Sequence, residues 1–446
     1  MSETNSPQKK IVVRFPPSPT GNLHIGSART ALFNFLYARK HGGNIFLRLE
    51  NTDENRSKAE YEANIFDALK WLGFAFDNDK VWRQNERKDI YRSHLKRLIK
   101  SGNAYISKET EGERKEVVRF KNPNKKIVFK DLIRGDIEFD TTELENFVIA
   151  RSIEEPLYHL AVIIDDHEMG VTHVIRGEDG ISNTPRQILI QEALGFPRPI
   201  YAHIPLILAP DRSKLSKRHG AIAVTEYRER GYLPEAIINY LALLGWNPGT
   251  NQEIFTLEEL IKAFELEKVQ KSGAIFSEEK LRSINRVHLH TKMKSAEFLP
   301  LLPESFKADR SEVGLLALLE IIFERMSTMA DFNVILRSGE FDFVLKAPSP
   351  TKERLCWKDT DAPTTKLRLS DALALFAAVP DSKFNKIKLR EILFPYAEAS
   401  GKGSVLWPVR VALSGMEKSP DPFTLGEILG KKETTERLRK AVAVLS

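Results

Sequence analysis

The chain has 446 residues, 42% of them hydrophobic and 29% charged, and a net charge of +6, which predicts a globular protein of two to four domains that is mildly basic but not histone-like. Its single cysteine, Cys356, excludes a disulfide framework and a cysteine-based zinc site, which fits a reducing compartment. The start MSETNSPQKK lacks the apolar segment of a signal peptide and no apolar run is long enough to span a membrane, so we expect a cytoplasmic protein.

Residues 11–50 have the pattern of a strand, a turn, a helix and a second strand. The strands are expected at 11–15 and 44–50, and the helix between them starts after a proline- and glycine-rich turn and stops at a pair of glycines. Such a βαβ unit contains two parallel strands, and its ligands bind beyond the carboxyl ends of the strands, at the helix N-terminus. His24 lies at that N-terminus, where a phosphate would bind, although a histidine in a surface turn is the alternative interpretation.

Two charged residues stand at unusual places in this first unit. Arg14 lies inside the first strand, where an arginine usually faces a ligand cleft or a paired acid. Glu50 ends the second strand, where it either holds an ammonium group of a ligand or only precedes the next helix, expected over 59–69. We expect residues 51–53, Asn-Thr-Asp, to cap that helix.

From about residue 82 the sequence predicts a small α+β insertion. A polar helix over 85–101 precedes short strand-like runs, which are separated by turn residues and lie at 117–120, 127–129, 137–139 and 147–149. The segment is basic, with cations at Lys121, Lys125, Lys126, Lys130 and Arg134. These cations either form an ordinary solvated surface or follow a phosphate backbone.

The pattern of buried strands returns after the insertion, at 158–167, 171–176 and 200–208, with a helix at 185–194 between the last two. Charged residues gather where these strands end, namely Asp165, Asp166, Arg176, Glu178 and Asp179. Because a buried charge without a partner is strongly unfavourable, this cluster indicates a ligand site at one edge of a parallel sheet.

A polar loop, DRSKLSKRHG at 211–220, follows the last of these strands. Its cations suit the phosphates of a nucleoside triphosphate, although a flexible basic loop is the alternative interpretation. These cations are Lys214, Lys217 and Arg218, and the hydroxyl of Ser216 lies between them. No GxxxxGK[ST] or GxGxxG motif follows the first strand, so a P-loop and a dinucleotide cofactor are only weakly indicated.

The rest of the chain is predicted to be helical. Helices are expected at 234–244, 256–263 and 277–287, the second of them with a capping box formed by Thr256 and Glu259. From residue 292 to the end, amphipathic helices with short links predict a helical domain with its own core.

HIGS at 24–27 and KLSKR at 214–218 resemble the two ATP-binding motifs of class I aminoacyl-tRNA synthetases. Longer segments narrow the resemblance to bacterial glutamyl-tRNA synthetases; these segments are VRFPPSPTGNLHIGSARTALFNFLYAR, LRLENTDENRS, VIRGED with SNTPRQ, and WPVRVALSG with SPDPF. Glutaminyl-tRNA synthetases are similar too, but they typically carry PEPNG where this chain has PSPTG and end in β-barrels. The resemblance covers nearly the whole chain and is thinnest at about 292–402.

This resemblance implies an α/β fold, with a split Rossmann-type parallel sheet and an α+β insertion, followed by a mostly α-helical C-terminal half. The implied domains are the first half of the Rossmann catalytic domain (1–81), the insertion that binds the tRNA acceptor end (82–154), the second half of the catalytic domain (155–208), a connecting domain that contains KLSKR and contacts the tRNA stem (209–291), and a helical anticodon-binding domain (292–446).

The implied activity is that of a glutamate–tRNA ligase. ATP and Mg²⁺ would convert L-glutamate to glutamyl-adenylate, and the glutamyl group would pass to the 3'-terminal adenosine of the tRNA for glutamate. Charging of the tRNA for glutamine stays open, and we expect a monomer without membrane association. Two alternatives are a paralogue that binds RNA without charging it, and a glutamyl transferase acting on a modified tRNA base; the long basic C-terminal half argues against the second.

The resemblance also assigns residues to the site. In such enzymes the positions of Arg14, Tyr158 and Arg176 line the pocket for the amino-acid side chain, and two guanidiniums facing a γ-carboxylate disfavour the neutral amide of glutamine. The positions of Ser18 and Glu50 hold the α-carboxylate and the α-amino group. The implied ATP-binding residues are Ser18, His24, Gly26, Lys214, Ser216 and Lys217, with His24, Lys214 and Lys217 as the catalytic ones.

Three positions depart from the family pattern. Many relatives carry a Cys/His zinc cluster in the insertion, but this chain has Tyr105-Ile106-Ser107 where the cysteines would begin, so we predict no zinc. Asn51 stands next to Glu50 where the family usually has Asp. Gly180 stands where the family usually has His, so the resemblance assigns no substrate contact there.

Overall fold

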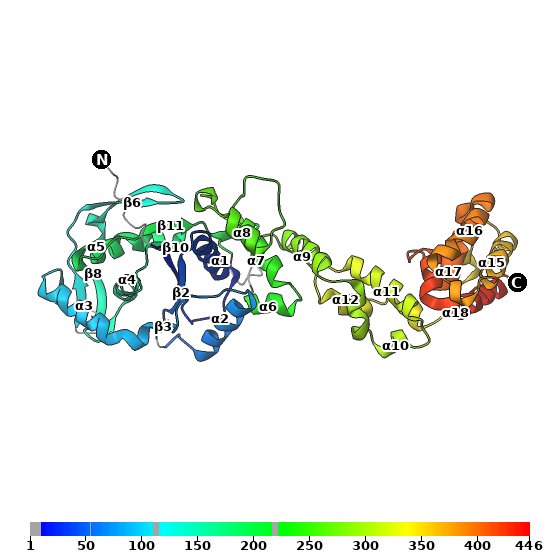
Figure 1. Cartoon of the computed structure of the whole chain (residues 1–446), viewed down its shortest axis with the longest axis horizontal. Helices are drawn as coiled ribbons and strands as arrows, with labels where there is room; N and C mark the ends of the chain where they lie inside the picture. The colour runs from blue at the N-terminus through cyan, green and yellow to red at the C-terminus, as the bar shows by residue number, and fades with distance from the viewer. Residues whose placement is uncertain (1–9, 54, 110–115, 216–221) are drawn as a thin grey trace. The chain divides into compact units, whose positions relative to one another are not determined.

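The computed structural model describes residues 10–53, 55–109, 116–215 and 222–446. The chain forms two compact units, Met1–His288 and Leu289–Ser446, and Figure 1 labels many of their elements. The first unit contains the α/β elements, and the described part of the second consists of helices and their links, as the sequence predicts.

The first unit begins with the predicted βαβ arrangement. Its elements are β1 (Val12–Phe15), α1 (Ile25–Lys40) and β2 (Asn44–Leu49). The two strands are parallel, with Val12 beside Asn44, and β3 (Trp82–Arg83) extends this sheet beyond β2. A Cβ atom on Gly43 would lie 2.4 Å from the carbonyl oxygen of Ile11, so only glycine fits where β2 begins. The turn before α1 therefore opens at the carboxyl end of β1, where ligands of such sheets bind.

The second half of the parallel sheet follows the insertion. Its elements are α4 (Tyr158–Glu168), β10 (His173–Gly177), η3 (Glu178–Asn183), α5 (Thr184–Leu194), β11 (Ile200–Ile204) and β12 (Ile207–Leu208). Strands β10 and β11 are parallel, with Arg176 beside His203. The backbone N–H of Thr172 donates to the carbonyl oxygen of Val12 at 2.9 Å, which brings β10 next to β1 and joins the two halves.

The strand expected at 158–167 is wrong, because this segment forms helix α4. Residues 160–166 are all buried, so their hydrophobicity shows no periodicity that separates a helix from a fully buried strand. Asp165 and Asp166 consequently lie within a buried helix and not at the end of a strand.

The insertion has the predicted helix and strands, but they do not form one sheet. Its elements are η1 (Gln84–Arg87), α3 (Lys88–Lys100), β4 (Ala104–Lys108), β5 (Glu116–Phe120), β6 (Lys126–Asp131), β7 (Gly135–Asp140), η2 (Thr141–Leu144), β8 (Phe147–Ser152) and β9 (Glu155–Pro156). Strands β4, β5, β8 and β9 form an antiparallel sheet in that order. The β6–β7 hairpin instead extends the sheet of β10 and β11, since Asp131 of β6 pairs with Tyr201 of β11.

Helices complete the first unit. They and the short elements among them are α2 (Ala59–Trp71), α6 (Val224–Glu229), α7 (Pro234–Leu243), α8 (Leu257–Ala263), η5 (Leu266–Lys268), β13 (Ala274–Ile275), which pairs with β12, and α9 (Glu278–Lys292). The predicted capping box of α8 is confirmed: Thr256 Oγ1 accepts from Glu259 N at 3.2 Å, and Glu259 Oε2 accepts from Thr256 N at 2.8 Å. The predicted cap of α2 is wrong, since its N-cap residue is Lys58, which makes no side-chain cap.

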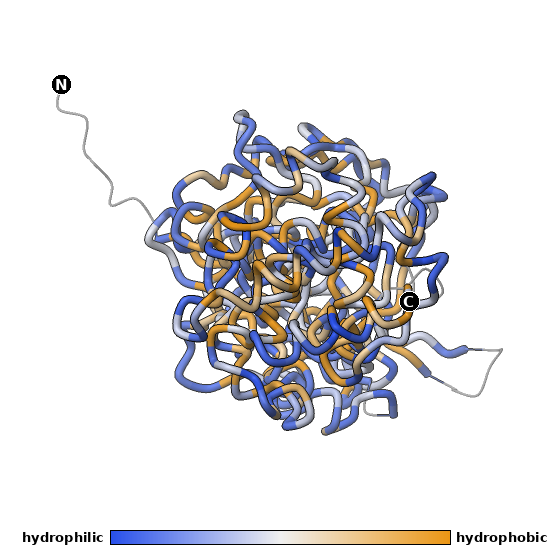
Figure 2. Tube along the Cα trace, turned by 90° about the vertical axis from the view of Figure 1, so that its right-hand side faces the viewer, coloured by the Kyte–Doolittle hydropathy of each residue, from blue (hydrophilic) through white to orange (hydrophobic). Residues whose placement is uncertain are grey.

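The described residues of the first unit include two groups of buried apolar side chains. One packs α1 between the sheet and helices α7 and α8, with the rings of Phe33 and Phe264 in edge contact at 5.0 Å. The other joins the insertion to α4 and α5. In Figure 2 the outer turns of the trace are mostly hydrophilic, as expected of segments that face water.

The second unit is a bundle of helices. Its elements are η6 (Ser295–Leu301), α10 (Glu304–Lys307), α11 (Glu312–Arg325), α12 (Asp331–Arg337), α13 (Asp342–Leu345), α14 (Lys352–Leu355), α15 (Ala362–Ala377), η7 (Asp381–Lys383), α16 (Lys386–Ser400), α17 (Lys402–Ser414) and α18 (Pro422–Val444). Helix α18 is kinked at Gly430, whose φ of 77° is left-handed. No helix in the described ranges is long and apolar enough to cross a membrane.

Candidate active site

Three of the predicted ATP-binding residues line one cavity of about 770 Å³. These residues are His24, Gly26 and Lys214, and the cavity also reaches Gly177 and Asp179 at the end of β10. It therefore lies at the carboxyl edge of the parallel sheet, against the first turn of α1, as the βαβ pattern predicts. Free backbone N–H groups and the positive end of the helix dipole make such a turn favourable for phosphate.

His24 is the N-cap residue of α1. Its Nδ1 atom accepts from the backbone N–H of Ser27 at 3.3 Å, so the imidazole stands across the first turn of the helix. A Cβ atom on Gly26 would lie 3.1 Å from that Nδ1 atom, which is tighter than ordinary contact. Glycine at 26 thus leaves room for the imidazole beside the cavity.

Lys214 brings a mobile positive charge to the same cavity. Its Nζ atom lies 3.9 Å from Asp179 Oδ2, and the two side chains are 65% and 66% exposed. An exposed pair at this distance is weak and can open for a stronger anion such as a phosphate. Ser216, Lys217 and Arg218 lie outside the described residues.

Ser18 lies next to this cavity, in the turn after β1. It lines a smaller cavity of about 140 Å³ together with His24 and Ser27. Its side chain is exposed, so the hydroxyl is available to a ligand that enters from the sheet edge.

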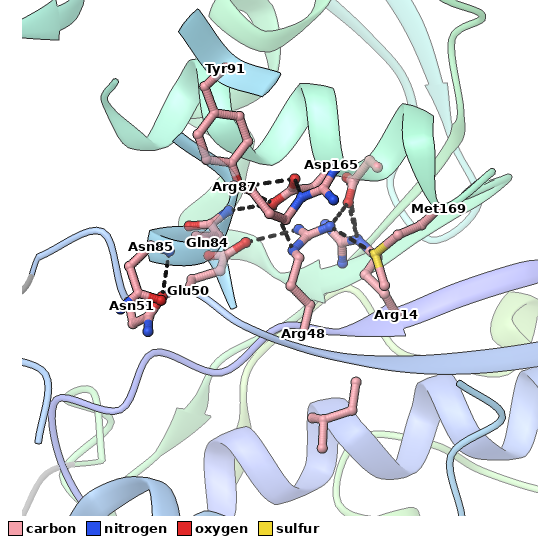
Figure 3. Close-up of polar contacts among 12 residues, drawn as sticks. Arg14, Arg48, Glu50, Asn51, Gln84, Asn85, Arg87, Tyr91, Asp165 and Met169 are labelled. Carbon is pink, nitrogen blue, oxygen red and sulfur yellow. Dashed lines mark hydrogen bonds and ion pairs between the residues drawn. The ribbon is translucent and has the colours of Figure 1, made fainter. Parts of the chain in front are cut away.

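Arg14 and Glu50 belong to a buried network of charges that Figure 3 shows. Arg14 is 1% exposed, and its Nε atom donates to Asp166 Oδ1 at 3.2 Å, so the acid expected beside it is Asp166 of α4. Arg48 of β2 donates to Asp166 Oδ1 at 2.7 Å through Nη1 and to Glu50 Oε1 at 2.9 Å through Nη2. One carboxylate therefore holds both arginines, and Arg48 in turn orients Glu50.

The neighbouring Asp165 ties this network to the insertion. Its carboxylate accepts from Tyr91 Oη at 2.8 Å, Arg87 Nε at 2.7 Å and Gln84 Nε2 at 3.0 Å. Asn51 adds a further link, because its Oδ1 accepts from the backbone N–H of Asn85 at 3.0 Å (Figure 3). The sheet, α4 and the start of the insertion are thus held together by buried, directional contacts.

Burial and opposite charges act against each other in this network. Burial opposes the charge of Arg48, but the carboxylates of Asp166, Asp165 and Glu50 raise its pKa above the ordinary arginine value. Burial likewise opposes the charge of Asp166, but Arg14 and Arg48 hold the pKa of that carboxyl below its usual range. For Glu50 burial prevails over Arg48 and raises the pKa, so a cation placed beside this carboxylate would stabilise its charged form.

Tyr158 and Arg176 face the same region. Burial and the charge of Glu50 raise the pKa of Tyr158, while Arg176 and Arg14 act in the opposite direction. Four of the five side chains predicted to bind glutamate, all except Ser18, therefore interact electrostatically. Arg14 lies on β1, Glu50 directly follows β2, Tyr158 begins α4 and Arg176 lies on β10. Tyr158 is 37% exposed, which places it at the edge of this group, where a ligand can enter.

Sequence reasoning missed part of this site. Arg48, Gln84, Arg87 and Tyr91 received no role, although Arg48 stands inside an apolar strand as Arg14 does and offered the same signal. Gln84, Arg87 and Tyr91 carry no such signal, because only the fold brings them to Asp165. Among the described residues, no group of three or more His, Cys, Asp and Glu side chains is arranged to hold a metal ion.

Comparisons with known proteins cover almost the whole chain. A family model described as tRNA synthetases class I (E and Q), catalytic domain, matches residues 10–116 and 106–283, and one described as anticodon binding domain matches 288–442. Glutamate–tRNA ligase of Carboxydothermus hydrogenoformans is 38% identical over 96% of this chain and 99% of its own length.

The chain belongs to the glutamate–tRNA ligase family.

Other relatives agree with this membership. Glutamate–tRNA ligase of Aquifex aeolicus is 48% identical over 66% of this chain and 68% of its own length. A crystal structure of a glutamate tRNA ligase from Elizabethkingia meningosepticum, in complex with its amino acid, matches with a TM-score of 0.85 at 32% identity and covers 98% of this chain and 100% of that one. The predicted resemblance and fold class are confirmed, including the helical C-terminal unit in place of the β-barrels of glutaminyl-tRNA synthetases.

Proposed function

We propose that the protein activates L-glutamate with ATP and transfers the glutamyl group to the 3'-terminal adenosine of the tRNA for glutamate. Two observations support this proposal: Arg14, Glu50 and Arg176 all act electrostatically on Tyr158, and Gly177, which follows Arg176 on β10, lines the cavity of His24 and Lys214. An acidic amino acid and a triphosphate placed there would lie side by side. The anticodon-binding family match of the second unit supports tRNA as the acceptor.

Arg14 and Arg176 are proposed to bind the γ-carboxylate of glutamate, with Tyr158 at the mouth of the pocket. Hydrogen bonds to charged groups contribute about 1.5–3 kcal/mol each, and the neutral amide of glutamine would leave one guanidinium poorly matched. Glu50 would hold the α-ammonium group, whose charge offsets the burial of its carboxylate. Ser18 would hold the α-carboxylate, which must point toward ATP.

The proposed chemistry needs no covalent protein nucleophile. The α-carboxylate of glutamate attacks the α-phosphorus of ATP in line, pyrophosphate leaves, and the ribose hydroxyl of the tRNA then attacks the acyl-adenylate. His24 and the first turn of α1, which Gly26 leaves open, would stabilise the phosphate oxygens. Lys214 would do so together with Lys217 and Ser216.

The cavity fits a Mg²⁺ ion that is held mainly by the phosphates of ATP. Asp179 offers an exposed carboxylate there, and Mg²⁺ commonly binds one or two carboxylates together with substrate phosphates. When bound, the ion neutralises negative charge on the phosphates.

The remaining parts of the proposal concern tRNA. Residues 82–154 would bind the acceptor end between the catalytic segments 1–81 and 155–208, residues 209–291 would contact the stem, and residues 292–446 would read the anticodon. We further propose a cytoplasmic monomer that holds one tRNA. Charging each purified tRNA with labelled glutamate tests whether the tRNA for glutamine is also a substrate.

ATP–pyrophosphate exchange tests the proposed activity. We expect glutamate-dependent exchange when tRNA for glutamate is present, together with charging of that tRNA. A protein that shows no exchange, either with or without tRNA, and charges no tRNA would be an RNA-binding paralogue, and the proposal would be wrong.

Replacing Arg176 tests the pocket assignment. Arg176→Ala is expected to raise KM for glutamate at least about tenfold and KM for ATP less than about twofold, because the lost guanidinium contacts only the amino acid. Arg228→Ala is the control, since its guanidinium is 39% exposed and binds Asp67. Equal increases in the two KM values would contradict the assignment.

A further inference from the structure

The side chain of Arg176 is held by uncharged groups. Its Nε atom donates to His203 Nε2 at 3.1 Å, and its Nη2 atom donates to the carbonyl oxygen of Gly180 at 2.9 Å and to Thr184 Oγ1 at 2.8 Å. Arg176 forms no ion pair with any described residue. These contacts leave Nη1 as the part of the guanidinium without a hydrogen bond to the described chain.

His203 is oriented for this contact by Asp131. The register of the parallel strands places His203 of β11 beside Arg176 of β10, and Asp131 ends β6 on the other side of β11. Asp131 Oδ2 lies 2.6 Å from His203 Nδ1, and both side chains are fully buried. Because a carboxylate only accepts hydrogen bonds, Nδ1 carries the proton and Nε2 is the acceptor that Arg176 needs.

Asp131 is itself fixed in place. Its Oδ1 accepts from the backbone N–H groups of Ile133 at 2.9 Å and Arg134 at 2.8 Å, and its Oδ2 accepts from His203 N at 3.0 Å. Burial opposes the charged form of His203 and, together with the charge of Arg176, outweighs the carboxylate of Asp131, so the pKa of His203 is lowered and the neutral imidazole keeps its acceptor. The hydrogen bonds that link Asp131, His203 and Arg176 are therefore fixed in place, and each donor and acceptor in them has a defined role.

Gly180 provides the space for Arg176. A Cβ atom at this position would lie 2.5 Å from Arg176 Nε, 2.8 Å from Cδ and 3.0 Å from Cζ. Gly180 is not among the glycines with left-handed φ, so a side chain is excluded by the guanidinium and not by the backbone. This accounts for glycine at a position where the family pattern has a larger residue, since the present conformation of Arg176 requires it.

We propose that Asp131, His203, Thr184 and Gly180 form a holder that fixes Arg176 with Nη1 toward the side-chain carboxylate of the substrate, and that this holder sets the preference for glutamate over glutamine. The inference rests on the proposed function. Because its partners are all uncharged, Arg176 keeps its full positive charge for the γ-carboxylate, whereas the amide of glutamine would bring N–H groups against a donor. Asp131 and His203 are positioning residues in this scheme, since they act through Arg176.

Two substitutions of His203 test whether its hydrogen-bond acceptor, and not only its bulk, is needed to hold Arg176. His203→Gln places an amide oxygen close to the position of Nε2, whereas His203→Leu has similar bulk and no acceptor; both lose the contact with Asp131. We expect His203→Leu to raise KM for glutamate about tenfold and KM for ATP less than about twofold, with a smaller increase for glutamate in His203→Gln. Equal effects of the two variants would overturn the role of the acceptor.

Gly180→Ala tests the same holder from another side, because it crowds Arg176 without removing any of its hydrogen-bond partners. The added methyl group should displace Arg176, raise KM for glutamate and lower the ratio of kcat/KM for glutamate to that for glutamine about tenfold. This variant also keeps the inference testable if His203→Leu does not fold, which thermal unfolding of each variant reports. An unchanged ratio in a folded Gly180→Ala protein would overturn the proposal.

A double substitution checks that His203 acts through Arg176. In the Arg176→Ala background, His203→Leu is expected to change KM for glutamate less than about twofold, because the residue it orients is gone. A full additional increase would overturn the holder. If the unchanged protein itself shows no glutamate-dependent exchange, the proposed function is wrong; if it exchanges normally but the variants raise both KM values equally, only the holder is wrong.

Discussion

Asp166 forms buried ion pairs with two arginines at the same time. It accepts from Arg14 and Arg48, which come from adjacent strands, while it is itself almost fully buried in α4. Such a carboxylate is stable only because two guanidiniums replace the water that it lost. Removing its charge would leave two buried arginines short of a partner, so the energetic effect should greatly exceed that of a surface ion pair.

Asp166→Asn is accordingly expected to lower the free energy of unfolding by about 3–5 kcal/mol, measured by urea denaturation at pH 7. Asp67→Asn is the matched control, because Asp67 is 50% exposed and pairs with Arg228 at the surface, where about 0–1 kcal/mol is usual. Equal effects of the two substitutions would mean that the Asp166 network is open to water. The lowered pKa of Asp166 also implies that its contribution is present above about pH 4 and is lost as the pH falls further.

His159 makes the free energy of unfolding depend on pH in a higher pH range than Asp166 does. Burial and the guanidiniums of Arg186 and Arg176 lower its pKa from 6.5 to about 4. Between these values the unfolded chain binds a proton that the folded chain does not, so stability falls as the pH decreases from 6.5 toward 4. The free energy of unfolding should therefore decrease between pH 7 and pH 4 by about 1–3 kcal/mol less in His159→Gln than in the unchanged protein, measured by urea denaturation. The same decrease in both proteins would contradict this prediction.

The sequence predicted single residues where a local signal existed. Arg14 stands out because it interrupts an apolar strand, which indicates either a ligand cleft or a paired acid, and the structure pairs it with Asp166. The partner itself could not be predicted, since it lies far along the chain and only the folded sheet brings it close. His203 and Asp131 look like ordinary residues of buried strands, and their connection to Arg176 depends on strand register alone.

At the scale of elements, the insertion is less basic than its composition suggests. Three of its cations have carboxylate partners. The Nζ atom of Lys125 lies 2.6 Å from Glu192 Oε2, and that of Lys126 lies 2.8 Å from Glu138 Oε1. The third cation, Arg134, pairs with Glu178. Lys121 and Lys130 form no ion pair with a described residue, and both are exposed. If the insertion contacts phosphates of tRNA, these two side chains should contribute most, because no described carboxylate forms an ion pair with them.

A double substitution of Lys121 and Lys130 to alanine is therefore expected to raise KM for tRNA about three- to tenfold without changing KM for glutamate. Lys126→Ala is the control within the same insertion, because Glu138 already offsets its charge, and it should change KM for tRNA less than about twofold. Aminoacylation at several tRNA concentrations measures both. A larger effect of Lys126→Ala would contradict this assignment and would place the contact at the start of β6, at Lys126.

Element types were predicted best where amphipathic periodicity or capping residues mark them. Helix α1, helix α8 with its capping box and the strands of the insertion lie close to their predicted positions. Helix α4 was wrong because its buried positions remove the periodicity that distinguishes a helix. The position of the β6–β7 hairpin beside β11 was also beyond sequence reasoning, since pairing between distant strands leaves no local pattern.

For the whole molecule, the net charge of +6 and the buried network predict different responses to salt. Exposed cations that bind phosphates release counterions, so their contribution falls steeply as the salt concentration rises. Arg14 is 1% exposed, so salt would screen its proposed interaction with glutamate much less. A change in ionic strength alone should therefore alter KM for tRNA much more than KM for glutamate.

Raising KCl from about 50 to about 200 mM is expected to increase KM for tRNA at least about tenfold and KM for glutamate less than about threefold. Steady-state aminoacylation measures the first value, and ATP–pyrophosphate exchange at saturating tRNA measures the second. Potassium acetate at the same concentrations is the control for a specific effect of chloride. A KM for glutamate that rises as steeply as that for tRNA would mean that solvent ions reach the side chains around Arg14, because buried charges do not respond to salt in that way.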